Sequence, residues 1–297
     1  MSQYAISVEN VSKYFGKFKA VSSVSFKVDK GEIFGFLGPN GAGKTTCIKM
    51  MLDLLRPDQG QVKVFGKEVI KNSVEIRKSI GFLPGNFTHF DNMSGIEYLK
   101  FAANQRQQDF KYPQELIDIF ELSSTDLNKK MKSMSHGMLQ KIGIIQAVFH
   151  APELLILDEP TTGLDPLMQD VFYNLIKDLH SKGVTIFFSS HNLSEVERIC
   201  HNIAVIRAGE IVAMETIENL KKKVFRKLTV KLKQKVENIH ISGAELISSE
   251  GFKYDFLVTG SVESLIKDLS ELPVDDIVFP EPGLDEVFIS YYNSDKK

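Results

Sequence analysis

The chain has 297 residues, of which 43% are hydrophobic and 25% are charged, and its formal net charge is −2. This composition is ordinary for a folded globular protein, and the length favours one large domain followed by a smaller one. The small net charge gives no electrostatic reason to expect a nucleic-acid partner. Two widely separated cysteines, Cys47 and Cys200, show no metal-ligand spacing. No apolar run approaches the roughly 20 residues that cross a bilayer, and no signal peptide is recognisable, so we expect a cytoplasmic protein.

The first part of the chain alternates short strands and turns. Three segments alternate apolar and polar residues, which predicts half-buried antiparallel strands: Ala5–Val8, Val24–Val28 and Gln61–Phe65. Four continuous apolar runs are typical of parallel strands covered on both faces: Ile33–Leu37, Ile80–Leu83, Leu154–Leu157 and Val184–Phe188. Two further strands flank a turn at Ala208-Gly209. The pattern predicts an α/β core that carries an antiparallel β subdomain.

Helical signals replace strand signals between about residues 85 and 150. Ser94 and Glu97 form a capping-box pattern that opens a helix running to about Asn104. Pro113 occupies a first helical position ahead of Gln114–Phe120. We expect a helical insert within the α/β core. The core and the insert together make up a first domain of residues 1–220.

The remaining residues, 221–297, are expected to form a small C-terminal α+β domain with a helix around Ser261–Ser270. Its first stretch, Lys221 to Lys235, holds eight basic residues and no acidic one, while Leu228, Val230 and Leu232 alternate with polar residues. We favour a half-buried strand with a solvated lysine face over a patch that binds a membrane or a partner.

An apolar strand, a glycine-rich loop and an amphipathic helix follow one another from Ile33 to Leu55. The loop has the pattern G-x-x-x-x-G-K-T, formed by Gly38, Pro39, Asn40, Gly41, Ala42, Gly43, Lys44 and Thr45, with Thr46 next in the helix. Such a loop directs backbone N–H groups and the positive end of a helix dipole at one phosphate. The lysine can reach the β- and γ-phosphates, and the threonine hydroxyl can bind Mg²⁺. Because the context disfavours an incidental turn, the sequence predicts a nucleoside triphosphate site.

Two of the predicted parallel strands end in residues that suit this chemistry. Asp158 and Glu159 follow Leu154–Leu157, at the strand end where open α/β sheets bind ligands. We expect Asp158 to hold the Mg²⁺ shell and Glu159 to act as general base for a water that attacks the γ-phosphate. His191 follows Val184–Phe188 in the same way. With a nucleotide at that edge, we interpret it as orienting the water and the γ-phosphate rather than as a structural histidine.

From about Ala5 to Leu220 these motifs, in this order, resemble those of the ATP-binding subunits of ABC transporters. Gly38–Thr45 resembles Walker A, and Leu154–Glu159 resembles Walker B with its catalytic glutamate. Phe15 falls at the aromatic position that stacks on adenine, in preference to Tyr14. The resemblance implies a P-loop NTPase fold and ATP with Mg²⁺ as cofactors.

The resemblance extends to residues that act between two subunits. His191 falls at the switch-histidine position, and Asp165 lies at the centre of a segment that resembles the D-loop. Met134–Gln140 occupies the place of the signature motif, which usually reads L-S-G-G-Q. In the family a serine and backbone amides at this helix start face the γ-phosphate bound by the other subunit, a role that Ser135 and Gly137 preserve.

Two motifs depart from the family pattern. The signature carries His136 in place of the first glycine and Met138 in place of the glutamine. The family's usual L-P-Q is L-P-G here, so Gly85 replaces the glutamine that senses Mg²⁺, and Asn86 is one candidate substitute. Both departures resemble the branch of exporters associated with antibiotic and drug resistance.

The resemblance implies a homodimer or heterodimer that sandwiches two ATP molecules and drives an integral membrane permease from the inner face of the cell membrane. Phe87 and Phe90 in the helical insert are either a docking surface for the permease or packing within the insert. A C-terminal stretch, Pro282–Ile289, resembles the tail of these exporters and is expected to pack as a terminal helix. A regulatory ATP-binding protein that acts without transport is the alternative. A P-loop kinase, and an ABC-type protein acting on ribosomes or DNA, are disfavoured.

Overall fold

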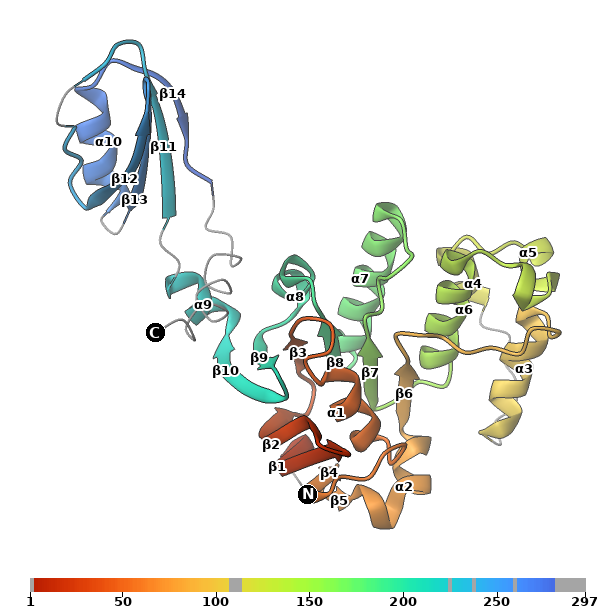
Figure 1. Cartoon of the computed structure of the whole chain (residues 1–297). Helices are drawn as coiled ribbons and strands as arrows, with labels where there is room; N and C mark the ends of the chain where they lie inside the picture. Colours follow the sequence, from red (N-terminus) through yellow and green to blue (C-terminus); the bar gives the residue numbers. More distant parts are fainter. Residues whose placement is uncertain (1–2, 107–113, 224–225, 237–238, 259–260, 281–297) are drawn as a thin grey trace. The chain divides into compact units, whose positions relative to one another are not determined.

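The computed structural model describes residues 3–106, 114–223, 226–236, 239–258 and 261–280 (Figure 1). The chain divides into two compact units, Met1–Thr216 and Ile217–Lys297. Pro113 and the Pro282–Ile289 tail, both singled out in the sequence, lie outside the described residues. No helix within the described ranges is long and apolar enough to cross a membrane.

The first unit begins with an antiparallel sheet of order β2-β1-β4-β5. Its strands are β1 (Tyr4–Phe15), β2 (Phe18–Asp29), β4 (Gln59–Val64) and β5 (Lys67–Glu68). The hairpin between β1 and β2 places Phe15 opposite Phe18. In β2 every second residue from Val24 to Val28 is buried, as its alternating pattern predicts. Residues 5–8 are all buried, so this part of β1 is covered on both faces rather than half-buried as its alternating pattern predicted.

The second sheet of this unit has the order β10-β9-β3-β8-β7-β6. Its strands are β3 (Ile33–Leu37), β6 (Ile80–Leu83), β7 (Leu154–Asp158), β8 (Thr185–Ser190), β9 (Asn202–Arg207) and β10 (Glu210–Thr216). All neighbours pair in parallel except β10, which is antiparallel to β9. Every residue of β3, β7 and β8 is buried, so the continuous apolar runs correctly predicted strands that are covered on both faces.

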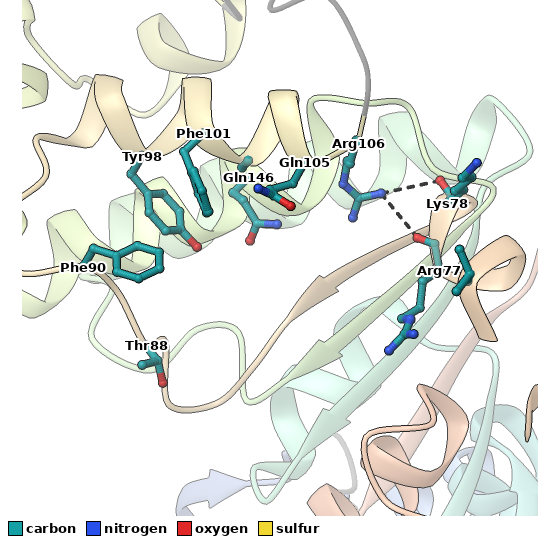
Figure 2. A pocket seen from close by; sticks show the side chains of 11 residues that line it. Arg77, Lys78, Thr88, Phe90, Tyr98, Phe101, Gln105, Arg106 and Gln146 are labelled. Carbon is teal, nitrogen blue, oxygen red and sulfur yellow. Dashed lines mark hydrogen bonds between the residues drawn. The ribbon is translucent and has the colours of Figure 1, made fainter.

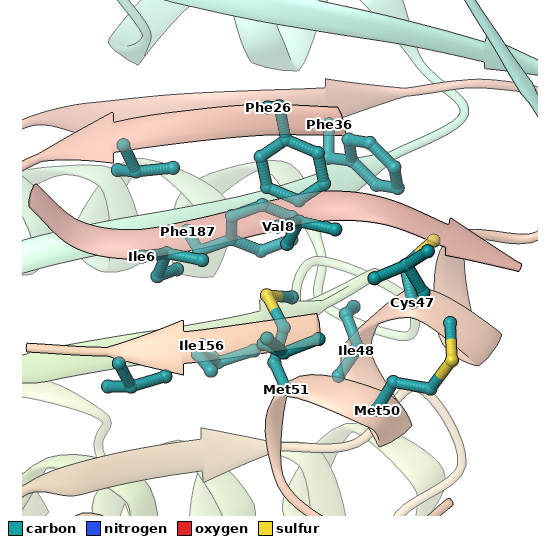
Figure 3. Close-up of a cluster of buried hydrophobic side chains, with 14 of the residues drawn as sticks. Ile6, Val8, Phe26, Phe36, Cys47, Ile48, Met50, Met51, Ile156 and Phe187 are labelled. Carbon is teal, nitrogen blue, oxygen red and sulfur yellow. The ribbon is translucent and has the colours of Figure 1, made fainter. Parts of the chain in front are cut away.

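The main core lies where the two sheets face each other (Figure 3). Phe26 of β2 packs against Phe36 and Phe187 of the parallel sheet, with ring centroids 5.3 and 5.9 Å apart. The helix α1 (Lys44–Met51) inserts Ile48 and Met51 into the same cluster. Because α1 starts directly after the glycine-rich loop, its buried face holds that loop in place at the edge of the sheet.

The other helices of the first unit are α2 (Val69–Lys78), α3 (Gly95–Gln105), α4 (Gln114–Ile119), α5 (Ser124–Asn128), η1 (Met131–Ser133), α6 (His136–Val148), α7 (Pro166–Ser181) and α8 (Leu193–Ile199). The segment from α3 to α6 follows β6 and precedes β7, and the regular elements described in it are short helices joined by turns. At the start of α3, Ser94 and Glu97 form both hydrogen bonds of the predicted capping box.

The second unit contains α9 (Ile217–Lys223), β11 (Arg226–Leu232), β12 (Ala244–Glu250), β13 (Lys253–Val258), α10 (Val262–Ser270) and β14 (Val274–Val278). The four strands form an antiparallel sheet of order β12-β13-β11-β14. Leu228, Val230 and Leu232 are buried with Leu265 and Leu269 of α10, whereas Lys231 is exposed. This alternation confirms the half-buried strand expected from the lysine-rich stretch.

Both cysteines are buried in the first unit and form no disulfide. Burial raises the pKa of the Cys47 thiol to about 12 and also raises the pKa of Cys200. Both thiols therefore stay protonated at neutral pH, as expected of cysteines that serve only in packing.

Candidate nucleotide-binding site

The glycine-rich loop lies between β3 and α1. Gly41 and Gly43 have φ angles of 79° and 109°, in the left-handed region that favours glycine. A Cβ atom on Gly43 would also lie 2.7 Å from the carbonyl oxygen of Ala20. The loop therefore needs glycine here for both its backbone angle and its close packing, and it turns its amides toward the start of α1.

Lys44, the first residue of α1, folds back over the loop. Its side chain is almost completely buried, and its Nζ donates to the carbonyl oxygens of Gly38 at 2.6 Å and Pro39 at 3.2 Å. The same Nζ lies 3.1 Å from Glu159 Oε1. The Lys44 ammonium thus connects the phosphate loop with Glu159, the residue that follows β7.

Asp158, the last residue of β7, is held from two sides. Its Oδ2 accepts a hydrogen bond from Thr45 Oγ1 at 2.7 Å, and its Oδ1 accepts one from Ser189 Oγ at 2.6 Å. The aspartate is only 2% exposed, so these bonds fix its carboxylate. Ser189 is a site residue that the sequence did not single out, although it follows the apolar run of β8 directly.

The Thr45 hydroxyl and the Asp158 carboxylate are oxygen donors of the kind that Mg²⁺ prefers. Within the described ranges no group of three or more His, Cys, Asp or Glu side chains could hold a metal ion. An Mg²⁺ ion bound with a nucleotide takes one or two protein ligands and completes its shell with phosphate and water. The donor set therefore fits the ion that the sequence predicts.

Glu159 adopts a φ of 51°, a left-handed conformation that is uncommon for a residue other than glycine. Its backbone N–H donates to the carbonyl oxygen of Ser189 at 3.1 Å. Its Oε2 lies 2.6 Å from Nδ1 of His191, which follows β8. The strained turn thus directs the carboxylate between His191 and Lys44, and strain of this kind is common at functional sites.

A cavity of about 310 Å³ opens over these groups. Its lining joins the loop and Glu159 to two aromatic residues of the β1–β2 hairpin, Phe15 and Phe18, and comprises Phe15, Phe18, Ala20, Pro39, Asn40, Gly41, Gly43, Lys44, Thr45, Thr46 and Glu159. Phe15 and Phe18 are 52% and 64% exposed, so both rings are free to stack on a base. Phe15 was expected here, whereas Tyr14 does not line the cavity and Phe18 was missed.

Three other predicted residues lie on helix starts outside this lining. Ser135 caps α6, and its Oγ accepts a hydrogen bond from the Met138 N–H at 3.2 Å. Gly137 follows in the first turn of α6. Asp165 caps α7 through a 3.0 Å bond from the Met168 N–H to its Oδ1. Within one chain the Walker-type residues therefore lie together around the cavity, whereas the signature and D-loop residues do not line it.

Gly85 lies directly beside Asp158. A Cβ atom at this position would be 3.3 Å from the Asp158 carbonyl oxygen and 3.5 Å from its Oδ2. A side chain at residue 85 would therefore lie in contact with Asp158. Asn86 is exposed and does not line the cavity.

Comparison with known proteins places these motifs in a family. A family model described as ABC transporter matches residues 21–162. An uncharacterized ABC transporter ATP-binding protein from Nostoc sp. is 41% identical over 69% of this chain and 62% of its own length. The bacitracin transport ATP-binding protein BcrA of Enterococcus faecalis is 39% identical over 74% of this chain and 72% of its own. The linearmycin resistance ATP-binding protein LnrL of Bacillus subtilis is 35% identical over 72% of this chain and 70% of its own length.

Solved structures share the same fold over 71–74% of the chain. The structure of an ATP-binding subunit of an ABC transporter gives a TM-score of 0.68 at 28% identity, covering 74% of this chain and 92% of the other. A dimeric bacterial ABC transporter cassette gives a TM-score of 0.65 at 24% identity, covering 71% of this chain and 98% of the other.

Proposed function

The chain belongs to the ABC transporter family as an ATP-binding ATPase subunit, and we propose that it powers a separate membrane permease that exports antibiotics or other lipophilic compounds. The observation that carries this proposal is the convergence of Lys44, Glu159 and His191 beside the Thr45–Asp158 pair. The similarity to BcrA and LnrL, together with Gly85 and the S-H-G-M signature, supports the export of antibiotics.

The geometry supports a division of labour in hydrolysis. Lys44 exchanges its loop carbonyls for the β- and γ-phosphates, and the exposed rings of Phe15 and Phe18 hold the base. Glu159 takes a proton from the attacking water, and His191, 2.6 Å from its carboxylate, orients the pair. Thr45 and Asp158 would hold Mg²⁺, which would neutralise phosphate charge.

A second ATP-binding subunit completes each site in this proposal. Ser135, Gly137 and Asp165 lie outside the nucleotide cavity of their own chain. Ser135 and Asp165 are exposed at helix starts, where the backbone N–H groups of α6 are available to an anion. A homodimer places Ser135 and Gly137 of each subunit over the nucleotide of the other, and a heterodimer with a related subunit is the alternative.

We propose that the permease docks in a groove of about 670 Å³ between α2 and α3 (Figure 2). Phe90 lines this groove, is 52% exposed, and stacks edge-on against Phe101 with centroids 5.4 Å apart. Phe87 packs edge-on against Tyr98, is less exposed than Phe90 and lines an adjoining cavity of about 290 Å³, which favours the packing alternative for that residue. Phe90 is therefore the aromatic residue that we assign to docking.

The charge of the groove indicates the partner's chemistry. Three basic residues, Arg77, Lys78 and Arg106, line it and no carboxylate does. The Arg106 guanidinium donates to the carbonyl oxygens of Arg77 at 3.4 Å and Ile80 at 3.0 Å, which fixes this end of the groove. We therefore expect a permease loop that presents an apolar side chain toward Phe90 and a carboxylate toward the basic end.

Reconstitution tests the transport proposal. The chain is purified with a candidate multi-span membrane permease and placed in vesicles, where bacitracin or another lipophilic antibiotic is expected to stimulate ATP hydrolysis and to accumulate. Lys78→Glu is expected to weaken co-purification with the permease, while Lys100→Glu, exposed on α3 but outside the groove, serves as the control. Hydrolysis that is insensitive to any membrane partner would instead favour a regulatory ATPase without transport.

A further inference from the structure

A histidine ring connects the start of α6 to the loop that follows Glu159. His136 is the first residue of α6, and a Cβ atom placed on Gly163 would lie 2.0 Å from its Nδ1 and 2.8 Å from its Cε1. Both residues are exposed, but a real Cβ does not approach another atom so closely. The ring of His136 therefore occupies the place that a side chain at residue 163 would take.

Two further contacts join the same segments. Gln140, which is buried one turn further along α6, donates from Nε2 to the carbonyl oxygen of Pro160 at 2.7 Å. A Cβ atom on Gly137 would lie 2.8 Å from the carbonyl oxygen of Gly163. With His136, these contacts attach the first two turns of α6 to residues 160–163 at three points, so the two segments are expected to move as one body.

These segments carry residues that belong to different ATP sites in the proposed dimer, on which this inference rests. Ser135, which precedes His136, faces the nucleotide of the partner subunit, whereas Glu159, which precedes Pro160, acts on the nucleotide of its own subunit. We propose that His136 is a positioning residue whose ring, seated on Gly163, fixes Ser135 relative to Glu159 and thereby couples hydrolysis at the two sites. A glycine, usual at this position, offers no such contact.

A cycle of size-exchange variants tests the contact within one chain. Gly163→Ala, His136→Gly and the double variant are melted as the full-length chain, and the calorimetric transition that ATP shifts reports on the nucleotide-binding unit. Gly163→Ala is expected to lower that melting temperature by several degrees more than Gly183→Ala does. Gly183 is a matched control, because its φ of 87° resembles the 83° of Gly163 and its added Cβ meets no atom within 4 Å.

The double variant then tests whether His136 and Gly163 are in contact. Removing the ring is expected to abolish the excess loss caused by Gly163→Ala, leaving a loss similar to that of the control variant. If the melting temperature lost by the double variant equals the sum of the losses of the two single variants, His136 and Gly163 are not in contact.

ATP hydrolysis tests the coupling. His136→Ala is expected to lower kcat about tenfold, a change within the range of typical couplings between sites. The Hill coefficient is expected to fall toward one, and KM is expected to stay unchanged. His136→Phe, which keeps a ring without a titratable group, is expected to restore both and to leave the pH profile of kcat unaltered. Failure of this rescue, or a shifted pH profile, would assign His136 an acid–base role and overturn the inference.

The Glu159→Gln chain separates this inference from the proposed function. If that chain forms no dimer with ATP, the proposed shared sites and the coupling fail together. If it forms a dimer while the melting cycle is additive, only the role of His136 fails.

Discussion

Lys44 Nζ lies 3.1 Å from Glu159 Oε1, although the two residues come from different motifs far apart in the chain. Both side chains are largely buried, the lysine more than the glutamate. The contact places the group that we propose to bind the terminal phosphates next to the group that we propose to activate water. Substitutions of the two residues are nevertheless expected to have different effects, because only Lys44 is needed for binding and only Glu159 for proton transfer.

Glu159→Gln is expected to bind ATP with nearly unchanged affinity and to hydrolyse it roughly 100 to 10,000 times more slowly, because the amide cannot accept the proton. The trapped ATP should stabilise a dimer. Steady-state phosphate release and size-exclusion chromatography with ATP measure the two effects. Normal turnover by this variant would exclude Glu159 as the base.

Lys44→Ala is expected to abolish ATP binding or hydrolysis, since the loop loses the cation that contacts the phosphates. Lys49→Ala, an exposed lysine on the same helix α1, is the matched control and should retain both activities. Equilibrium binding of a fluorescent ATP analogue and an ATPase assay check this prediction. Wild-type activity of Lys44→Ala would contradict the phosphate-loop assignment.

Ser189→Ala is expected to raise the Mg²⁺ concentration needed for half-maximal hydrolysis by about tenfold, because partners that orient a metal-binding carboxylate typically contribute that much. The variant removes the 2.6 Å bond to Asp158 Oδ1. Ser190→Ala is the neighbouring control, since Ser190 donates to Glu195 instead. An equal Mg²⁺ requirement in wild type and Ser189→Ala would show that this bond does not support the metal site.

Phe15→Ala and Phe18→Ala are each expected to weaken ATP binding, because one stacked base contributes about 1–3 kcal/mol. Inorganic triphosphate, which has no base, should bind both variants as it binds the wild type. Tyr14→Ala, outside the cavity, should leave both affinities unchanged. Competition binding measures all three, and a loss confined to Phe15→Ala would mean that Phe18 makes no base contact.

The lowered pKa of His150 predicts how the stability of the folded chain depends on pH. Burial lowers the pKa of His150 from 6.5 to about 4, and its Nε2 lies 3.2 Å from the Ile80 carbonyl oxygen. Between these two values the unfolded chain binds more protons than the folded one, so stability is lost as the pH falls from about 6.5 to 4. Urea unfolding at pH 7 and pH 5 should show a larger loss for wild type than for His150→Phe. Equal losses would exclude this histidine as the cause.

Much of the fold was predictable because its signals are local. The apolar runs that form β3, β6 and β7, and the capping box at Ser94, depend on nearby residues only. Strand ends were less predictable: β8 continues through Ser189 and Ser190, which are polar but buried, because their hydroxyls bond to Asp158 and Glu195. Those partners lie elsewhere in the sequence or after the strand.

The nucleotide site was predictable to the extent that it uses motifs. The residues that were missed depend on contacts between distant segments or across a turn. Phe18 reaches the cavity because the hairpin pairs it with Phe15, and nothing in its immediate sequence marks it. The seat of His136 on Gly163 likewise joins two segments whose proximity is set by the packing of α6.

The burial of Cys47 and Cys200 has a practical consequence for watching this subunit at work. These are the two cysteines of the whole chain, and both stay in the thiol form behind packed side chains. Maleimide dyes react with exposed thiolates, so a cysteine introduced on the surface would be labelled selectively without removing the natural ones. A single such dye on each subunit would let fluorescence energy transfer follow the approach of two chains in real time.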